Sequence, residues 1–214
     1  MQYKAVIFDF DYTLGDSTEG IITSADFALE EMGYKPAERE AIRRTIGLSL
    51  PETYTALTGD GNPDKREEFR LLFVKKADEI MTANSELYPE AEGILRYLKQ
   101  KEIKVAVVTT KFDYRIEGIL EKCDAREYVQ MIVGGNNVAN PKPDPEGTLM
   151  VLKKWNLVQE ELLYVGDSLV DAKTAQNAEV DFAGVTTGTT SAEDFRTYNS
   201  VGIFSNLAEL MKFL

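Results

Sequence analysis

The chain has 214 residues, 43% of them hydrophobic and 28% charged, the balance of a soluble globular protein with one sizeable core and room for a small second domain. A net charge of −12 would repel nucleic acid and anionic lipid, so neither is expected as a partner. The sequence contains no histidine, which excludes histidine bases, histidine metal ligands and every Ser-His or Cys-His catalytic pair.

Cysteine content and hydropathy indicate where the protein works. The single cysteine, Cys123, excludes an internal disulfide and a thiolate metal cluster, which suits a reducing cytoplasm. No apolar run approaches the ~20 residues of a membrane span, and the N-terminal run is too short for a signal peptide. We therefore expect a cytoplasmic protein.

The first predicted element is a buried parallel strand at residues 5–8, an apolar run that two acids, Asp9 and Asp11, follow directly. Residues i and i+2 of a strand point to the same face, so both carboxylates can reach one spot beyond the strand. Open α/β sheets place their ligands at that edge. Two acids that only cap the following turn are the alternative without a function.

Residues 15–83 contain no strong strand pattern. Apolar residues recur at helical spacing over residues 21–32, 37–46 and 64–81, and segments rich in glycine or proline separate these runs. A helical segment of this length directly after one strand predicts a small helical domain inserted into a second fold.

From residue 84 onward, strand and helix patterns alternate. Strands are predicted at residues 104–109, 131–134, 162–166, 181–185 and 202–204. This alternation predicts a parallel sheet with right-handed crossovers. The expected fold class is α/β, with a core domain of residues 1–14 and 84–214 and an inserted helical domain of residues 15–83.

Three more features lie where predicted strands end. Thr109 can offer a hydroxyl to an anionic oxygen, or it can cap a turn. Lys142 lies between two prolines that stiffen the backbone, so its ammonium is either a rigid phosphate partner or part of an exposed loop. Asp167 and Asp171 are four residues apart and share a helix face, where they can bind a ligand or cap the helix.

Together and in this order, these features resemble the motifs of the haloacid dehalogenase superfamily, over essentially the whole chain. The matching residues are Asp9, Asp11 and Thr13 for the first motif, Thr109 for the second, Lys142 for the third, and Gly166, Asp167 and Asp171 for the fourth. The helical insert resembles the cap of the branch with phosphoglycolate phosphatases, pyrophosphatases and β-phosphoglucomutases. Tyr12 departs from that branch, which usually has glycine there, and its bulk could narrow the substrate range.

The resemblance implies a Rossmann-like core and a Mg²⁺-dependent phosphatase that acts on a small phosphorylated metabolite through an aspartyl-phosphate. Asp9 would attack phosphorus, and Asp11 would protonate the leaving alkoxide and later take a proton from water. The implied phosphate contacts are Asp9, Phe10, Asp11, Thr109, Thr110 and Lys142. The implied metal ligands are Asp9, the backbone carbonyl of Asp11, and Asp167, with Thr13, Ser168 and Asp171 supporting them.

Three alternatives remain open. A pyrophosphatase and a phosphomutase belong to the same superfamily. The β-phosphoglucomutases carry a histidine in the first cap helix, where this chain has Ile21, and this favours a phosphatase over a mutase. A receiver-like phosphate-binding module is the non-enzymatic alternative, but receiver domains lack a helical insert and a second acid at i+2. The identity of the substrate and the oligomeric state cannot be predicted from the sequence.

Overall fold

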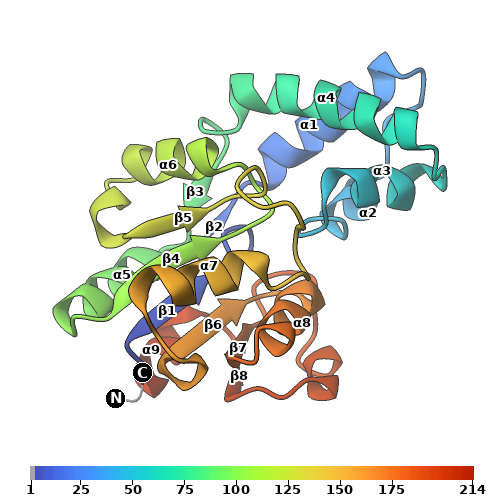
Figure 1. Cartoon of the computed structure of the whole chain (residues 1–214). Coiled ribbons are helices and arrows are strands. Elements are labelled where there is room, and N and C mark those ends of the chain that lie inside the picture. The colour runs from blue at the N-terminus through green and yellow to red at the C-terminus, as the bar shows by residue number, and fades with distance from the viewer. Residues whose placement is uncertain (1–2) are drawn as a thin grey trace. The chain divides into compact units, whose positions relative to one another are not determined.

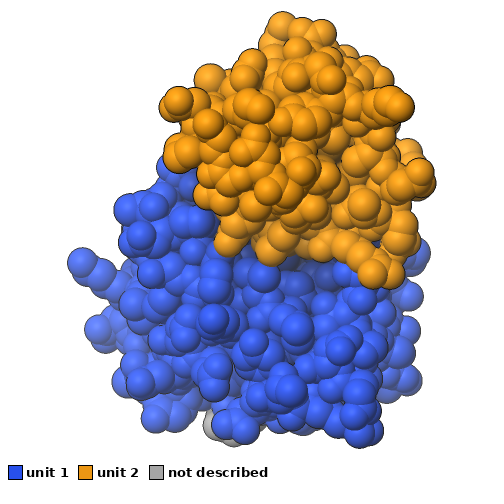
Figure 2. Space-filling view, turned by 90° about the vertical axis from the view of Figure 1, so that its right-hand side faces the viewer, with its two compact units in different colours: residues 1–16, 87–214 blue, residues 17–86 orange. Residues whose placement is uncertain are grey.

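The computed structural model describes residues 3–214, and the chain divides into two compact units (Figure 2). Unit 1 comprises residues 1–16 and 87–214, and unit 2 comprises residues 17–86. The fold class is the predicted one, because unit 1 is an α/β fold built on a parallel sheet.

Six strands of the described chain form the sheet of unit 1, in the order β5-β4-β1-β6-β7-β8. Their neighbours pair in parallel throughout. The strands are β1 Ala5–Phe8, β4 Lys104–Val108, β5 Met131–Val133, β6 Leu162–Gly166, β7 Asp181–Val185 and β8 Gly202–Phe204. β1 lies between β4 and β6, so its carboxyl end opens at the middle of the sheet.

Helices cover both faces of this sheet (Figure 1). α5 (Ala91–Gln100), α6 (Asp113–Lys122) and α9 (Leu207–Phe213) pack on one face, where alternate residues such as Val6 and Phe8 of β1 meet them. α7 (Glu146–Trp155) and α8 (Leu169–Asn177) pack on the other face, against Ala5 and Ile7. β1 is therefore buried on both sides, which explains its uninterrupted apolar sequence.

Short elements complete the fold. β2 (Gly15–Asp16) and β3 (Glu86–Leu87) pair as a second, two-stranded sheet. Three 3₁₀ turns lie in the connections of unit 1: η1 Arg126–Tyr128, η2 Gln159–Glu161 and η3 Asp194–Thr197. None of the helices within residues 3–214 combines the length and the apolar character needed to span a bilayer.

Unit 2 is helical, with α1 Thr18–Glu31, α2 Arg39–Arg43, α3 Leu50–Thr58 and α4 Pro63–Ile80. Its own core gathers buried side chains of all four helices, among them Leu29, Ile42, Tyr54 and Phe69. The helix predicted at 37–46 was too long, because α2 ends at Arg43 and residues 44–48 continue as tight i→i+3 turns.

Candidate active site

The two acids of the first motif lie at the carboxyl end of β1 and are buried. The backbone N–H of Asp9 donates to Val165 O at 2.9 Å and so continues the ladder between β1 and β6. Asp9 and Asp11 are only 2% and 8% exposed. Carboxylates this deeply buried need cations or hydrogen-bond donors to stay charged. The sheet thus holds two acids at the edge where α/β folds bind ligands.

Each of these acids faces a buried lysine. Lys142 Nζ lies 3.0 Å from Asp9 Oδ1, and Lys111 Nζ lies 3.2 Å from Asp11 Oδ2. Asp9 Oδ1 has only this ion contact with Lys142, and Asp11 Oδ1 has neither a hydrogen bond nor an ion pair among the described residues. The site therefore contains one buried carboxylate oxygen, Asp11 Oδ1, that remains available to a ligand.

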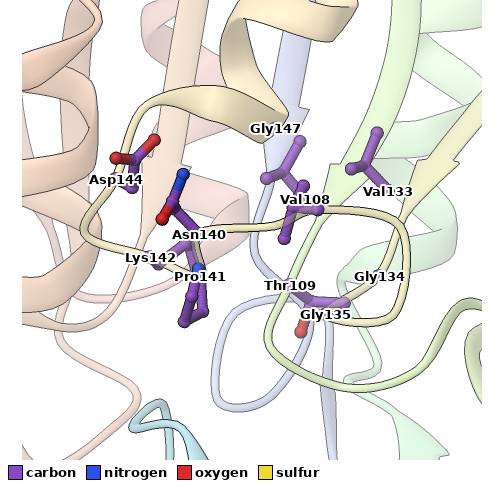
Figure 3. Close-up of a pocket in the computed structure, with 11 residues that line it drawn as sticks. Val108, Thr109, Val133, Gly134, Gly135, Asn140, Pro141, Lys142, Asp144 and Gly147 are labelled. Carbon is purple, nitrogen blue, oxygen red and sulfur yellow. The ribbon is translucent and has the colours of Figure 1, made fainter.

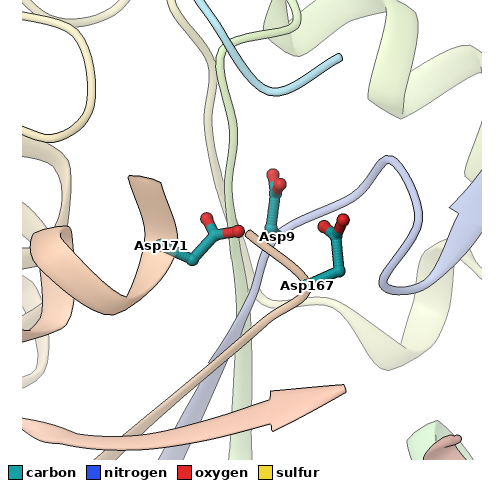
Figure 4. Close-up of side chains that lie close together, drawn as sticks. All are labelled: Asp9, Asp167 and Asp171. Carbon is teal, nitrogen blue, oxygen red and sulfur yellow. The ribbon is translucent and has the colours of Figure 1, made fainter. Parts of the chain in front are cut away.

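Asp167 and Asp171 bring two more carboxylates from the connection between β6 and α8. One oxygen each of Asp9, Asp167 and Asp171 fall within 4.8 Å of one another, and Figure 4 shows the three side chains converging. Thr13 donates its hydroxyl to Asp167 Oδ1 at 3.3 Å. Three buried acids at this spacing form a candidate metal centre with oxygen ligands.

The oxygens of Asp171 are already engaged by protein donors. Lys142 Nζ lies 2.6 Å from Oδ1, and Tyr164 donates its hydroxyl to the same atom at 3.4 Å. The backbone N–H and the hydroxyl of Ser168 both donate to Oδ2. Asp171 therefore caps α8 and fixes Lys142, and it is less free to bind a cation than Asp9 or Asp167.

Lys142 and Thr109 line the same small pocket beside these acids (Figure 3). Lys142 is 6% exposed, so the alternative of a lysine in an exposed loop is wrong. Burial by itself would lower the pKa of Lys142, but the carboxylates of Asp171 and Asp9 raise it well above its usual value. Lys142 is thus a permanently charged ammonium next to Asp9.

The remaining predicted phosphate contacts are less distinctive. Thr109 is buried and its hydroxyl accepts from the backbone N–H of Lys111 at 3.3 Å, which is the turn contact that the alternative interpretation expects. Thr110 is half-buried in the same connection. The side chain of Phe10 lies in the core, so only its backbone can meet a ligand.

Burial also changes the acidity of the carboxylates. It raises the pKa of Asp9 to about 7, with Lys142 opposing the rise and Asp171 and Asp11 adding to it. Burial raises the pKa of Asp167 well above its usual value too, and the charges of Asp171 and Asp9 add to the effect. Without a bound cation, this cluster is therefore costly to ionise.

This cost predicts how the stability of the metal-free protein depends on pH. A carboxyl whose pKa is raised on folding destabilises the folded state once the pH exceeds its unfolded value. For Asp9, the free energy of unfolding should fall between the unfolded value of 3.8 and about 7, and then level off. With EDTA present at pH 8, the free energy of unfolding of Asp167→Asn should exceed that of the wild type by about 1 kcal/mol or more, and the variant should melt at a higher temperature.

The control for this prediction is the same comparison at pH 5, where the gain should shrink because the acids are partly protonated. Thermal melts followed by circular dichroism at both pH values measure it. A variant that is less stable than the wild type at pH 8 would contradict the interpretation of Asp167 as a buried, uncompensated acid.

Two residues of the site, Tyr164 and Gly188, carried no signal in the sequence, and two others stood out only through the resemblance to the phosphatase branch. Tyr164 lies within the apolar run of β6. Lys111 ends the stretch 107–111 that resembles phosphoglycolate phosphatases, but no separate role for it was visible in the sequence. A Cβ at Gly188 would lie 1.9 Å from Asp167 Oδ2, so only glycine lets the loop after β7 approach this acid. Tyr12 has φ +59°, a left-handed conformation that favours glycine, and Thr187 donates its hydroxyl to Tyr12 O.

Comparison with known proteins identifies the family. The family model described as haloacid dehalogenase-like hydrolase matches residues 6–185. A phosphoglycolate phosphatase of Photorhabdus laumondii is 30% identical over 97% of this chain and 91% of its own. Pyrophosphatase PpaX of Listeria welshimeri is also 30% identical, over 96% of this chain and 94% of its own.

The solved structures agree with the sequence comparison. A haloacid dehalogenase-like hydrolase from Bacteroides fragilis is 41% identical, covers 97% of this chain and 99% of its own, and superposes with a TM-score of 0.94. A Haemophilus somnus protein described as a predicted phosphoglycolate phosphatase is 25% identical, with a TM-score of 0.88 over 100% of this chain and 98% of its own. The resemblance to the haloacid dehalogenase superfamily is thereby confirmed, and this chain belongs to the haloacid dehalogenase-like hydrolase family.

Proposed function

We propose that this protein is a Mg²⁺-dependent phosphatase that hydrolyses a small organic phosphate monoester through an aspartyl-phosphate on Asp9. The observation that carries the proposal is the pairing of Asp9 with the buried ammonium of Lys142, beside Asp11, whose Oδ1 has no partner among the described residues. The relatives named phosphoglycolate phosphatase and the family match support the same chemistry.

In the proposed reaction, a carboxylate oxygen of Asp9 attacks phosphorus and the ester oxygen leaves. Asp11 donates a proton to that leaving oxygen and afterwards takes a proton from the water that attacks the phosphoryl group on Asp9. Lys142 offsets the negative charge of the phosphate as it meets the carboxylate. Thr109 holds a phosphate oxygen, and the backbone N–H groups of Phe10, Asp11 and Thr110 meet the others, since those of Tyr12 and Thr13 donate to Gly15 O and Phe10 O.

The cluster of acids fits Mg²⁺, which prefers oxygen ligands. Asp9, Asp167 and the backbone carbonyl of Asp11 would hold the ion, because the oxygens of Asp171 are engaged by Lys142 and Ser168. Burial raises the pKa of Asp9 and of Asp167, so a bound cation would offset the cost of ionising them. When bound, the ion supplies charge that draws the phosphate toward Asp9.

The metal assignment predicts a thermal shift. A ligand that binds only the folded state raises the melting temperature. Millimolar Mg²⁺ should therefore raise the melting temperature of the wild type and raise that of Asp167→Asn much less. The reference for both proteins is metal-free buffer with EDTA. An equal shift in both proteins would count against a site that includes Asp167.

We also assign unit 2, which contains most of the predicted insert 15–83, as the cap that selects the substrate. Arg43 and Arg44 of unit 2 are not assigned as substrate contacts, because both pair with Glu40 nearby in the same segment. The single cysteine is the basis for proposing a cytoplasmic location.

A substrate panel tests the proposed function. Phosphate release should require Mg²⁺ and occur with p-nitrophenyl phosphate and with small monoesters such as 2-phosphoglycolate, faster than with pyrophosphate. Sugar phosphates and nucleotides complete the panel. Pyrophosphate as the best substrate would favour the second candidate function, which the relative named pyrophosphatase PpaX supports.

The same panel separates hydrolysis from the mutase alternative. β-Glucose 1-phosphate with a bisphosphate primer should release inorganic phosphate or remain unchanged, because Ile21 stands where the β-phosphoglucomutases have their cap histidine and the sequence contains no histidine. Formation of glucose 6-phosphate that outpaces phosphate release would contradict the proposal. Absence of turnover on every compound would favour a binding module.

A further inference from the structure

Loop 186–188 follows β7 and touches the proposed metal centre at two places, and the proposed mechanism gives it no role. β7 pairs in parallel with β6, and Asp167 follows β6 directly, so the loop leaves the sheet beside this acid. The backbone N–H of Thr186 donates to Phe204 O of β8 at 3.0 Å. The sheet therefore fixes the base of the loop.

The first contact joins Gly188 to the carboxylate of Asp167. A Cβ at Gly188 would lie 1.9 Å from Asp167 Oδ2 and 2.8 Å from Asp167 Cγ, well inside the ~3.5 Å of ordinary contact. The other oxygen of the carboxylate, Oδ1, accepts the hydroxyl of Thr13 at 3.3 Å. One oxygen of Asp167 is thus bound by Thr13, and the other packs against the backbone of the loop.

Space, and not backbone conformation, requires glycine at position 188. The φ of Gly188 lies outside the left-handed region, so its backbone would accept a residue with a side chain. The atoms in the way belong to the end of the Asp167 side chain, which can rotate. An alanine at this position should therefore turn the carboxylate aside while the fold survives.

The second contact joins the loop to the turn that follows Asp11. Thr187 donates its hydroxyl to Tyr12 O, and a Cβ at Gly188 would lie 3.1 Å from Tyr12 Cβ. Tyr12 has φ +59°, a conformation that is unfavourable for tyrosine and needs support from its surroundings. Because Asp11 directly precedes Tyr12, the hydroxyl of Thr187 supports the backbone that presents the Asp11 carbonyl.

We propose that Thr187 and Gly188 are positioning residues for the metal centre. Gly188 fixes the direction of the Asp167 carboxylate, and Thr187 fixes the turn that carries the Asp11 carbonyl. These two ligands follow different strands, so one loop sets the distance between them. Mg²⁺ demands near-ideal octahedral geometry, which makes its affinity sensitive to such a displacement. This inference rests on the metal assignment within the proposed function.

Calorimetric titration with Mg²⁺, on protein freed of metal by EDTA and dialysed, measures the effect without any substrate. Gly188→Ala should weaken Mg²⁺ binding roughly 10- to 100-fold, the range typical of residues that orient metal ligands. Thr187→Val removes the hydroxyl at nearly the same volume and should weaken binding about 10-fold. Thr187→Ser keeps the hydroxyl and should restore most of the affinity.

Gly93→Ala is the matched control for the added methyl group. Gly93 lies in α5, and a Cβ there would meet nothing within 4 Å. Mg²⁺ affinity should therefore equal that of the wild type, and the melting temperature should stay the same or rise, because alanine favours a helix more than glycine does.

A double-mutant cycle tests whether Gly188 acts through Asp167. Asp167→Ala removes the carboxylate and with it the two closest contacts of a methyl group at position 188. In EDTA, Gly188→Ala should lower the melting temperature of the wild type but not that of Asp167→Ala. If the single variant does not fold, the double variant should, because the obstacle is gone. Equal losses in both backgrounds, or a double variant that does not fold, would overturn the inference.

The outcomes separate this inference from the function beneath it. A Mg²⁺ dissociation constant that is the same in Gly188→Ala and in the wild type would overturn the role of Gly188 and leave the phosphatase intact. An unchanged constant in Thr187→Val would do the same for Thr187. A wild type that binds no Mg²⁺ would overturn both the inference and the metal assignment. A wild type that binds Mg²⁺ but hydrolyses no phosphate ester would overturn the proposed function alone.

Discussion

Replacing Asp9 by asparagine is expected to abolish turnover while the protein still folds. The amide keeps the shape of the side chain at the end of β1 but cannot attack phosphorus, so kcat should fall by about four orders of magnitude or more. The fold should survive, because a neutral amide needs no counter-charge and Lys142 keeps its contact with Asp171 at 2.6 Å. Initial rates with p-nitrophenyl phosphate and a thermal melt measure the two effects.

Asp124→Asn is the matched control for this variant. Asp124 is exposed and has φ +53°, a conformation that asparagine tolerates, so both activity and stability should remain those of the wild type. Peptide mass spectrometry must show that the introduced asparagine has not deamidated to aspartate. Substantial activity in an undeamidated Asp9→Asn protein would remove Asp9 from the role of nucleophile.

Replacing Lys142 by methionine is expected to damage both activity and stability. The change leaves two buried carboxylates, Asp9 and Asp171, without the ammonium that lies within 3.0 Å of each. Removing one partner of a buried ion pair typically costs about 3–5 kcal/mol. The loss of charge opposite the phosphate should lower kcat/KM by roughly two to three orders of magnitude.

The dependence on pH separates this effect from simple loss of packing. Because Asp9, whose pKa burial raises, can protonate, Lys142→Met should be closer to the wild type in stability at pH 5 than at pH 8. Urea unfolding at the two pH values measures the difference, with Lys104→Met as the control. If Lys142→Met is destabilised equally at both pH values, the cause is the lost packing of the side chain and not the lost charge.

The central strand and the acids that follow it could be predicted because their cause is local. Residues 5–8 are apolar on both faces since helices cover both faces of the sheet, and that pattern is visible in the sequence. Asp9 and Asp11 then follow at the strand end, where the backbone itself determines their position.

The contacts between distant segments could not be predicted, because no local pattern encodes them. Lys142 meets Asp171 from 29 residues away, and Tyr164 reaches the same carboxylate from inside an apolar strand. The Lys111–Asp11 pair depends on the register of β1 beside β4. The end of α2 was also missed, since apolar residues continue at helical spacing through turns that are not α-helical.

The central claim is a phosphoryl group carried by Asp9, and chemical trapping measures it most directly. The protein is mixed with substrate and Mg²⁺, quenched in acid, and treated with borohydride, which reduces an aspartyl-phosphate to homoserine. Asp11→Asn should increase the trapped fraction, because it lacks the base that activates water. We predict homoserine at position 9 by peptide mass spectrometry, only when substrate is present. Homoserine at another aspartate, or none while phosphate is being released, would contradict the mechanism.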